Sequence, residues 1–334
     1  MKRALITGIT GQDGAYLAKL LLEKGYKVYG MYRRSSTRNF WRLHYLGVKG
    51  EIELISGDLI DQTSIMQALI KAEPDEVYNL AAQSFVASSF EEPLATAEIT
   101  GLGAMRILDC LRIFNPQIRF YQAGTSEMFG NTPEVPQKEN TLMMPDSPYA
   151  AAKVFAYNIV RNYREGYGLF ACTGILFNHE SPIRGIEFVT KKITDGVARI
   201  KLGIIPGMYL GNLDTKRDWG FAGDYVKAMW LMLQQAAPMD YVIASGESHS
   251  VREFAEKAFA IAGLNWEQYV KVDQKFFRPR DIMELRGDST RAQKELNWNP
   301  RETTFDQLIE LMVKADFEKY QRPEAYMSYF LKHL

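Results

Sequence analysis

Short apolar runs alternate with helical patterns through the first half of the chain. The runs predict buried strands at Ala4–Thr7, Lys27–Tyr32, Ile52–Ser56, Glu76–Ala82, Arg119–Ala123 and Ala171–Phe177. Between them, a leucine stripe predicts a helix over Ala15–Lys24 that ends at Gly25, a residue suited to a C-cap. A longer amphipathic helix is predicted over Leu94–Phe114. This repeated order of strand, helix and strand predicts a doubly wound parallel α/β sheet of the Rossmann type.

The pattern changes after about Asn178, where loops rich in Gly and Pro replace the regular alternation. Two helices are still predicted there, over Val226–Gln235 and Val251–Ala262. We therefore expect a Rossmann domain over residues 1–177, with a returning segment near 219–245. Residues 178–334 are expected to form mainly a smaller α/β lobe that binds the substrate.

The composition is that of a folded chain, with 46% apolar and 24% charged residues among 334. Because 40 Lys and Arg balance 40 Asp and Glu, no general attraction to nucleic acid or anionic lipid is expected. We expect no membrane span, no signal peptide and no metal site. Cys110 and Cys172 are too few for a disulfide framework, so we interpret them as buried free thiols in a reducing cytoplasm.

Three glycines lie at the first predicted turn from strand to helix, Gly8, Gly11 and Gly14. Glycine allows a tight turn and a close approach of backbone to ligand, and the N–H groups at a helix start favour a pyrophosphate. A turn that merely needs glycine has the same composition. The place of this one, directly between a strand and an amphipathic helix, favours a dinucleotide cofactor.

The end of the second predicted strand indicates which dinucleotide. An acidic residue there would hold the ribose hydroxyls of NAD, but this chain has Arg33, Arg34 and Ser35. Guanidinium and hydroxyl groups suit a 2′-phosphate, which favours NADP. The alternative is a basic loop that is merely solvated.

Tyr149 and Lys153 lie four residues apart at the start of a predicted helix, so they share one face with about 6 Å of rise between them. A free tyrosine has a pKa of about 10, but a nearby ammonium favours the phenolate and makes it a usable base. This spacing also occurs by chance. Downstream of a dinucleotide loop, it predicts a base for a hydroxyl proton.

Thr125 and Glu127 follow directly after the fifth predicted strand. The carboxyl ends of strands in an open α/β sheet face the ligand crevice, so both side chains are expected to point at the substrate. A hydroxyl there suffices for oxidation or reduction, whereas a carboxylate adds a second proton carrier and makes elimination possible. The alternative for Glu127 is a salt-bridged or helix-capping residue.

With these residues, the sequence resembles the GDP-mannose 4,6-dehydratase family of the extended short-chain dehydrogenase/reductase superfamily. The glycine loop and the Tyr149–Lys153 pair are common to the superfamily. The matching stretches are residues 8–17, 79–84, 174–182, 216–224 and 277–279. The Asn-His-Glu-Ser-Pro stretch from Asn178 and the Arg-Arg-Ser-Ser stretch from Arg33 are more specific to the dehydratases.

The resemblance implies a reaction in which Tyr149 takes the proton of the carbon 4 hydroxyl of GDP-mannose, with Lys153 tuning it. The hydride of carbon 4 passes to NADP⁺, and the new ketone acidifies the proton at carbon 5. Glu127 removes that proton, and water leaves from carbon 6 with help from Glu127 and Thr125. Return of the hydride to carbon 6 gives GDP-4-dehydro-6-deoxymannose.

The remaining contacts are likewise carried over by position. The expected cofactor set is Gly8, Thr10, Gly11, Gln12, Asp13, Gly14, Arg33, Arg34, Ser35, Asp58, Leu59, Leu80, Ala81, Ala82, Gln83, Ser84, Tyr149, Lys153, His179 and Arg184. The expected substrate set is Ser84, Thr125, Glu127, Asn178, Lys192, Arg217, Arg278 and Asp281. Taken alone, Lys192, Arg217 and Arg278 could each be a solvated surface charge, and His179 a packed histidine. The family also implies a homo-oligomer, a dimer or tetramer, in which the 33–39 loop reaches a neighbour's cofactor.

Three positions depart from the family pattern. Asp281 stands where a longer glutamate is expected to hold the nucleotide sugar, and Met283 where an aspartate is usual. Gly124 replaces a common serine beside Thr125. The first two departures bear on sugar or nucleotide preference, and none of the three changes the four residues of the expected reaction.

Two other functions compete with the dehydratase. A nucleotide-sugar 4-epimerase or 4-keto reductase needs Thr125, Tyr149 and Lys153 but no base for carbon 5, so Glu127 discriminates against it. A non-catalytic NADP sensor would need neither Tyr149 nor Lys153. Fold alone does not separate these possibilities.

Overall fold

The computed structural model describes residues 1–277 and 282–324. Its centre is a seven-stranded parallel sheet in the order β10-β6-β5-β4-β1-β2-β3. The strands are β1 Arg3–Thr7, β2 Lys27–Tyr32, β3 Glu53–Ser56, β4 Glu76–Asn79, β5 Arg119–Ala123, β6 Ala171–Leu176 and β10 Tyr241–Ile243. The order reverses between β1 and β4, which is where a doubly wound sheet binds its ligand. The predicted fold class is confirmed.

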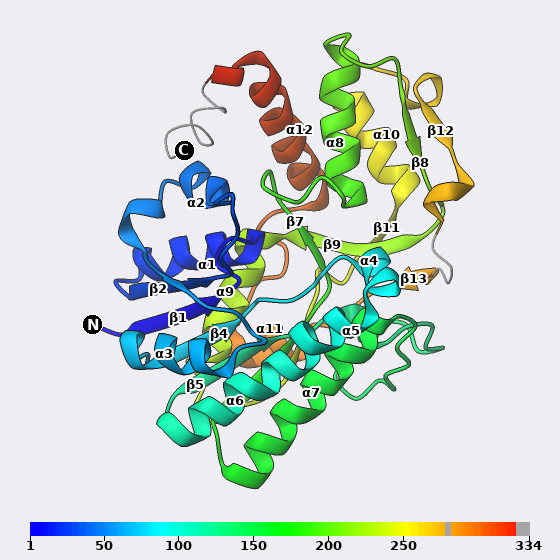
Figure 1. Cartoon of the computed structure of the whole chain (residues 1–334). Coiled ribbons are helices and arrows are strands. Elements are labelled where there is room, and N and C mark those ends of the chain that lie inside the picture. The colour runs from blue at the N-terminus through cyan, green and yellow to red at the C-terminus, as the bar shows by residue number, and fades with distance from the viewer. Residues whose placement is uncertain (278–281, 325–334) are drawn as a thin grey trace.

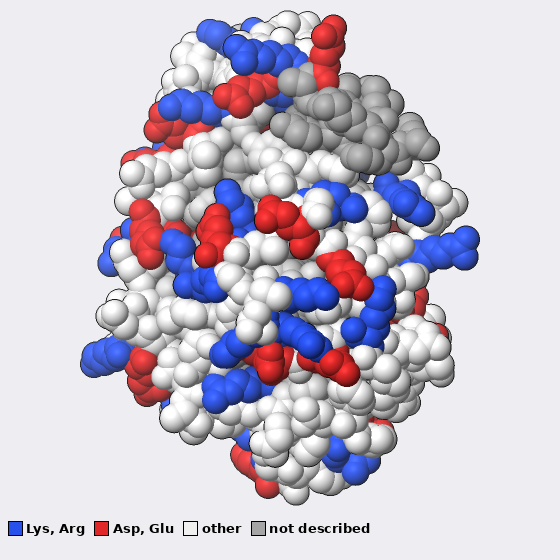
Figure 2. Space-filling view, turned by 90° about the vertical axis from the view of Figure 1, so that its left-hand side faces the viewer, with Lys and Arg blue, Asp and Glu red and all other residues white. Residues whose placement is uncertain are grey.

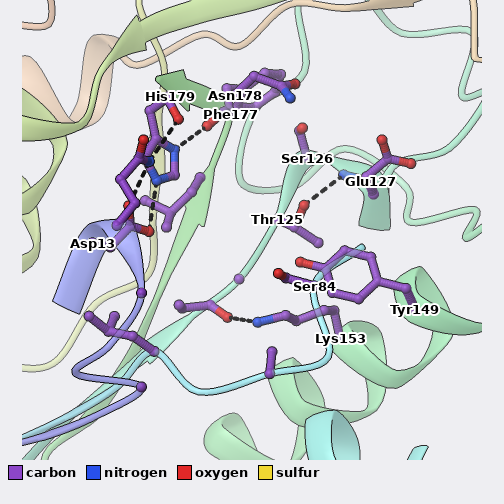
Figure 3. A pocket seen from close by; sticks show the side chains of 18 of the residues that line it. Asp13, Ser84, Thr125, Ser126, Glu127, Tyr149, Lys153, Phe177, Asn178 and His179 are labelled. Atoms are coloured by element: carbon purple, nitrogen blue, oxygen red, sulfur yellow. Dashed lines mark hydrogen bonds and ion pairs between the residues drawn. The ribbon is translucent and has the colours of Figure 1, made fainter. Parts of the chain in front are cut away.

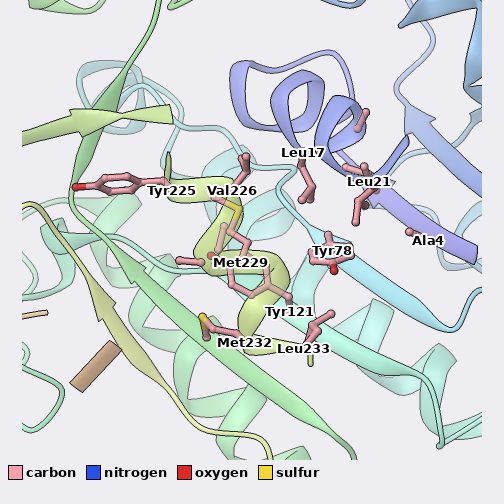
Figure 4. Close-up of a cluster of buried hydrophobic side chains, with 14 of the residues drawn as sticks. Ala4, Leu17, Leu21, Tyr78, Tyr121, Tyr225, Val226, Met229, Met232 and Leu233 are labelled. Atoms are coloured by element: carbon pink, nitrogen blue, oxygen red, sulfur yellow. The ribbon is translucent and has the colours of Figure 1, made fainter. Parts of the chain in front are cut away.

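Helices cover both faces of this sheet (Figure 1). On one face lie α1 (Gln12–Glu23), α9 (Ala222–Met232) and α11 (Thr290–Leu296), and on the other α3 (Gln62–Ala72), α6 (Gly103–Phe114) and α7 (Pro148–Tyr167). Figure 4 shows the first of these interfaces, where Leu17 and Leu21 of α1 lie near Val226 and Met229 of α9 above Tyr78. Because both faces are covered, most residues of the strands are buried, including the polar Glu76, Asn79 and Gln122.

Helix α1 begins three residues before the predicted helix and ends as its sequence requires. Gly25 has φ +77°, its N–H donates to Leu22 O at 2.9 Å, and the N–H of Tyr26 donates to Leu21 O at 2.9 Å. These two bonds form a Schellman motif, which satisfies the last carbonyls of the helix. Gly25 therefore closes the helix as predicted.

The predicted Leu94–Phe114 helix is one continuous rod with an irregular middle. It consists of α5 (Pro93–Thr96), a π-helical segment (Ala97–Leu102) and α6. Gly101 lies against α7, where an added Cβ would come within 3.3 Å of Phe155 Cδ1. The wider π turn occurs where this rod crosses α7 closely, a feature that apolar periodicity does not encode.

The second lobe contains more regular structure than the sequence pattern predicted. Three helices, α8 (Val189–Lys201), α10 (Val251–Ile261) and α12 (Phe305–Gln321), pack on one another. The small sheets beside them comprise β7 Asn178–Glu180, β8 Met208–Leu210, β9 Lys216–Phe221, β11 Ser248–Ser250, β12 Val270–Val272 and β13 Glu284–Leu285. The sequence pattern thus missed α8 and α12, and the predicted Val226–Gln235 helix begins and ends too late, since α9 covers Ala222–Met232.

Buried polar side chains explain this miss at α8. Lys191, Thr194 and Asp195 are buried together with Ile193 and Val197. Lys191 Nζ donates to Asp316 Oδ1 of α12 at 2.5 Å, and Thr194 Oγ1 donates to Asp316 Oδ2 at 2.7 Å. Val189, Ile193, Val197 and Ile200 do follow a helical spacing, so an apolar stripe is present, but the buried charged residues beside it obscure the pattern.

The remaining short elements are helices α2 Trp41–Tyr45 and α4 Val86–Glu91, and 3₁₀ turns at Lys49–Glu51, Ser126–Met128, Trp266–Gln268 and Gln274–Phe276. On the face shown in Figure 2, basic and acidic side chains are intermingled. Within residues 1–277 and 282–324, no helix combines the length and apolar character needed to cross a membrane. Cys110 and Cys172 are buried free thiols, as predicted.

Candidate active site

A cleft opens at the carboxyl ends of β1, β4, β5 and β6, where the strand order reverses. It brings together most of the predicted cofactor and catalytic residues. They are Gly8, Gly11, Gln12, Asp13, Gly14, Leu80, Ala82, Ser84, Thr125, Glu127, Tyr149, Lys153, Asn178, His179 and Arg184. Residues from sequence positions more than 100 apart therefore meet at one point of the fold, as a doubly wound sheet requires.

The glycine loop has the close backbone packing that a dinucleotide site needs. Gly8 has φ +69°, and a Cβ added to it would lie 2.7 Å from Ala81 N of the neighbouring strand end. At Gly14, an added Cβ would lie 2.4 Å from Gly8 O. Gly11 is the N-cap of α1 and has no side chain to occupy the first N–H groups. These groups face the cleft and fit a pyrophosphate.

Asp13 and His179 form a partly buried ion pair at one wall of the cleft (Figure 3). His179 Nε2 lies 2.8 Å from Asp13 Oδ2, and Nδ1 lies 2.8 Å from Phe177 O. Both partners accept only, so both ring nitrogens must donate and the imidazole is protonated. Burial opposes the charges, but the pair outweighs it, raising the pKa of His179 and lowering the pKa of Asp13 to about 2.

Tyr149 and Lys153 lie on the face of α7 that lines the cleft, with Lys153 Nζ 5.8 Å from the centre of the Tyr149 ring. Ser147 caps the helix, accepting from Ala150 N at 3.1 Å, and Pro148 occupies its first turn. Lys153 Nζ donates to Ala123 O of β5 at 2.7 Å. Burial raises the pKa of Tyr149 and lowers the pKa of Lys153 to about 8. Burial thus disfavours the charged form of both side chains.

Thr125 and Glu127 lie on the 3₁₀ turn that follows β5. The Thr125 hydroxyl accepts from Glu127 N at 3.3 Å, and it also lies within hydrogen-bonding reach of Tyr149, which counteracts the rise in the pKa of that phenol. Both Thr125 and Glu127 are buried, at 9% and 8% exposed. Figure 3 shows Thr125 between Glu127 and Tyr149. A hydroxyl, a phenol and a carboxylate therefore line the same cleft.

Arg184 is held by an ion pair and an aromatic ring. Its Nε lies 3.1 Å from Glu180 Oε2, and its guanidinium carbon lies 3.5 Å from the centre of the Phe188 ring. Phe188 lines both this cleft and a neighbouring cavity, so it forms part of the wall between them. Sequence reasoning missed Phe188, Ser126 and Val86 in the cleft, because a lone aromatic, hydroxyl or aliphatic residue carries no motif.

The neighbouring cavity gathers the predicted substrate cations Lys192 and Arg217 with Asn178. Arg217 Nη1 donates to Ile282 O and Lys216 O, each at 2.8 Å. The wall also contains the aromatic residues Phe188, Phe276 and Phe277. Arg278 and Asp281 lie outside the described residues.

Other predicted cofactor residues do not line the cleft. Arg34 and Ser35 line a separate hollow with Tyr32, Ser36, Arg38 and Ser56 at the ends of β2 and β3, and Arg33 is exposed beside them. Leu59 packs in the core, and Asp58 N donates to Ser64 Oγ. The backbones of Thr10, Ala81 and Gln83 bond Arg42, Thr7 and Thr100 respectively.

Comparisons with known proteins agree with this geometry. A family model described as GDP-mannose 4,6 dehydratase matches residues 5–312. GDP-mannose 4,6 dehydratase 1 of Arabidopsis thaliana is 52% identical, over 97% of this chain and 92% of that protein. The GDP-mannose 4,6 dehydratase of Homo sapiens is 50% identical, over 94% and 91%.

Solved structures share the fold at low sequence identity. The dTDP-glucose 4,6-dehydratase of Bacillus anthracis in complex with NAD superposes with a TM-score of 0.83 at 18% identity, covering 98% of this chain and all of that one, 100%. RMD of Pseudomonas aeruginosa complexed with NADPH gives 0.79 at 22% identity, covering 95% and 100%. These likenesses concern the fold.

Proposed function

The chain belongs to the GDP-mannose 4,6-dehydratase family, and on that premise we propose that Thr125, Glu127, Tyr149 and Lys153 carry out its reaction. It is a hydro-lyase that converts GDP-mannose to GDP-4-dehydro-6-deoxymannose and water. The observation that carries the assignment is that the Glu127 side chain lines the same cleft as Tyr149, Thr125 and Lys153. A plain dehydrogenase site has no need of that carboxylate.

Tyr149 accepts the proton of the carbon 4 hydroxyl. Burial raises its pKa, and the Thr125 hydroxyl and the Arg184 charge act in the opposite direction. Lys153 is fixed near Tyr149 by its bond to Ala123 O. The chemistry that a nicotinamide supplies in the cleft is temporary storage of a hydride, taken from carbon 4 and returned to carbon 6.

Glu127 removes the carbon 5 proton, which the carbon 4 ketone makes acidic enough for a carboxylate. The same group then protonates the carbon 6 hydroxyl as it departs as water, and the Thr125 hydroxyl assists. Both side chains belong to one turn held by the Thr125 bond to Glu127 N, so the carboxylate is held close to the phenol. Elimination follows oxidation without movement of the sugar to a second site.

The cofactor we propose is NADP. The glycine loop at Gly8 and Gly14 fits a dinucleotide, because neither position has room for a Cβ. Arg33, Arg34 and Ser35 stand at the end of β2 in place of an acidic residue and suit a 2′-phosphate. We also propose that residues 1–177, with a returning segment near 219–245, bind this cofactor.

The GDP moiety is proposed to occupy the neighbouring cavity, held by Asn178, Lys192 and Arg217. Convergent cations are needed for a diphosphate because the chain has a formal net charge of zero. Arg278 and Asp281 complete this proposed set. We further propose a cytoplasmic homo-oligomer, a dimer or tetramer, in which the 33–39 loop reaches the cofactor of a neighbour.

Purified protein incubated with NADP and GDP-mannose tests the activity. Mass spectrometry should detect a product lighter than GDP-mannose by one water, and much less with GDP-glucose as the control substrate. A product of unchanged mass would indicate a 4-epimerase instead. A product two mass units lighter, formed with reduced cofactor, would indicate a simple dehydrogenase.

A further inference from the structure

Two adjacent lysines of α8 are held in very different ways. Lys191 Nζ donates to Pro182 O at 2.7 Å and to Asp316 Oδ1 at 2.5 Å. Lys192 has no carboxylate partner among the residues that the structure describes. Its ammonium instead lies 3.7 Å from the centre of the Phe276 ring, over the face of the ring. Lys191 is therefore fixed by hydrogen bonds in the core, whereas the Lys192 ammonium rests on the Phe276 ring.

Phe276 lies on a segment whose last residues line the cavity. The segment Val270–Phe277 begins with β12, which pairs with β8, and ends in the 3₁₀ turn Gln274–Phe276. Asp273 caps this turn, accepting from Lys275 N at 2.9 Å. Gly211 lets the segment approach, since an added Cβ there would lie 2.7 Å from Phe276 O. The backbone of Phe276 is thus fixed although its side chain is 52% exposed.

Phe276 differs from the other exposed apolar residues in that it lines the cavity and lies under the Lys192 ammonium. A lysine over an aromatic face gains electrostatic attraction without an anion occupying its N–H donors. A carboxylate partner would compete with a diphosphate for the ammonium, whereas a ring does not. The burial of Lys192 lowers its pKa, which is consistent with an ammonium that has left bulk water without a neutralising anion.

We propose that Phe276 is a positioning residue for substrate binding, which holds the Lys192 ammonium at the cavity so that it meets the diphosphate of the nucleotide sugar. This inference rests on the proposed role of Lys192 in binding GDP. Phe276 acts through the lysine and takes no part in proton or hydride transfer. Its loss should therefore weaken binding and leave the chemical steps unchanged.

The test compares KM and kcat for GDP-mannose, and competitive inhibition by GDP and by guanosine, in Phe276→Leu and Lys192→Ala. We expect Phe276→Leu to raise KM and the inhibition constant of GDP about three- to tenfold, with kcat within about twofold. Guanosine, which lacks phosphates, should bind Phe276→Leu as tightly as it binds the wild-type protein. Phe276→Trp should restore binding, because tryptophan offers a stronger face to a cation.

A double variant and a matched control make the outcome decisive. Lys192→Ala with Phe276→Leu should be no weaker than Lys192→Ala alone, since the ring acts through the lysine. Tyr209→Leu, at an aromatic residue of β8 that is also 52% exposed, should leave KM unchanged.

If Phe276→Leu has no effect while Lys192→Ala raises KM, this inference fails and the proposed GDP site stands. If the two changes add, the ring contacts the substrate itself and the inference is wrong. If Lys192→Ala itself has no effect, the proposed GDP contact fails with it.

Discussion

The proposed catalytic cleft and the proposed nucleotide cavity share the wall formed by Phe188, yet they hold Lys153 and Lys192 in opposite ways. In the cleft, Lys153 is 3% exposed and Glu127 8%, and each is fixed by the end of β5. In the cavity, Lys192 is only partly buried and rests on Phe276, an exposed ring. The difference follows from the tasks: proton transfer needs groups held in advance at short range, whereas a diphosphate is bound by charges that can adjust.

Burial has a stronger electrostatic consequence in the cleft than at Lys192, where it lowers the pKa of a single partly buried lysine. It raises the pKa of Tyr149 and lowers the pKa of Lys153 to about 8, so both groups are pushed towards their neutral forms. A ligand that restores charge there gains a strong interaction in a dry environment. Substitutions in the cleft should therefore affect rate, and substitutions in the cavity should affect binding.

The largest expected effect tests the cleft directly. Glu127→Gln keeps the size of the side chain but removes the base for carbon 5, so turnover should fall by about 10²–10⁴. Binding of NADP and GDP-mannose should change little, because glutamine has nearly the same size and only the carbon 5 proton transfer is removed. Mass spectrometry for water loss and calorimetry for binding measure the two quantities.

Glu127→Asp is a useful companion, since it retains the carboxylate but shortens its reach. Partial activity is expected for it, at the cost of a longer proton transfer. Full turnover by the glutamine variant would refute the assignment and leave an epimerase or reductase mechanism in its place.

The next effect concerns the ion pair in the cleft wall. Asp13→Asn removes the partner of a buried imidazolium, so the free energy of unfolding should fall by about 3 kcal/mol near pH 5.5. Urea denaturation of the cofactor-free proteins at several pH values measures this loss.

The loss should depend on pH in a defined direction. The pKa of Asp13 is lowered to about 2 and that of His179 is raised. Stability from the pair is therefore complete between about pH 4 and pH 6.5, and it fades on either side as Asp13 gains or His179 loses a proton. A difference between wild type and variant that does not change with pH would show that the pair is not ionised.

A smaller effect distinguishes the two dinucleotides. Replacing Arg33 and Arg34 together by alanine should weaken NADP binding about ten- to hundredfold, because charge-assisted contacts to a 2′-phosphate are lost. NAD, which lacks that phosphate, should bind almost as before. Fluorescence titration with both cofactors makes the comparison, and equal losses would show that the phosphate is not recognised there.

The smallest effect concerns the helix that carries Tyr149 and Lys153. Ser147→Ala removes the cap that accepts from Ala150 N, which should lower the free energy of unfolding by about 1 kcal/mol. Ser147→Asp keeps an acceptor and should be close to wild type. Denaturation curves of the three proteins suffice, and an alanine variant as stable as wild type would show that the cap contributes nothing.

The sheet was predictable because its strands are buried on both faces and bounded by recognisable turns. Gly25 closes α1 as expected, and the six predicted strands match the structure at most ends and differ by one residue at three, whereas β10 was not predicted. The exception, Glu76–Ala82, ends early at Asn79 because Ala81 packs against Gly8. Helix α8 was missed because Lys191 and Asp195 face the core beside Ile193 and Val197, so polar and apolar residues are mixed on its buried side.

The site was predictable as far as motifs reach. Tyr149, Lys153, Thr125 and Glu127 were named from spacing and from their place after a strand, and they meet in one cleft. Phe188 and Phe276 were not, because a single aromatic residue carries no motif, although both lie near predicted cations in the sequence. The roles of all these residues stay predictions until the variants are measured.

The edge strand β10 has a consequence for synthesis of the chain. Strand β10 pairs with β6 but follows α8 and β9 in the sequence. The central sheet therefore cannot be completed until residue 243 has been translated. A nascent chain of the first half exposes the apolar edge of β6 and the surface that α9 later covers. We expect the cofactor half to mature late on the ribosome, and fragments that stop before β10 to aggregate.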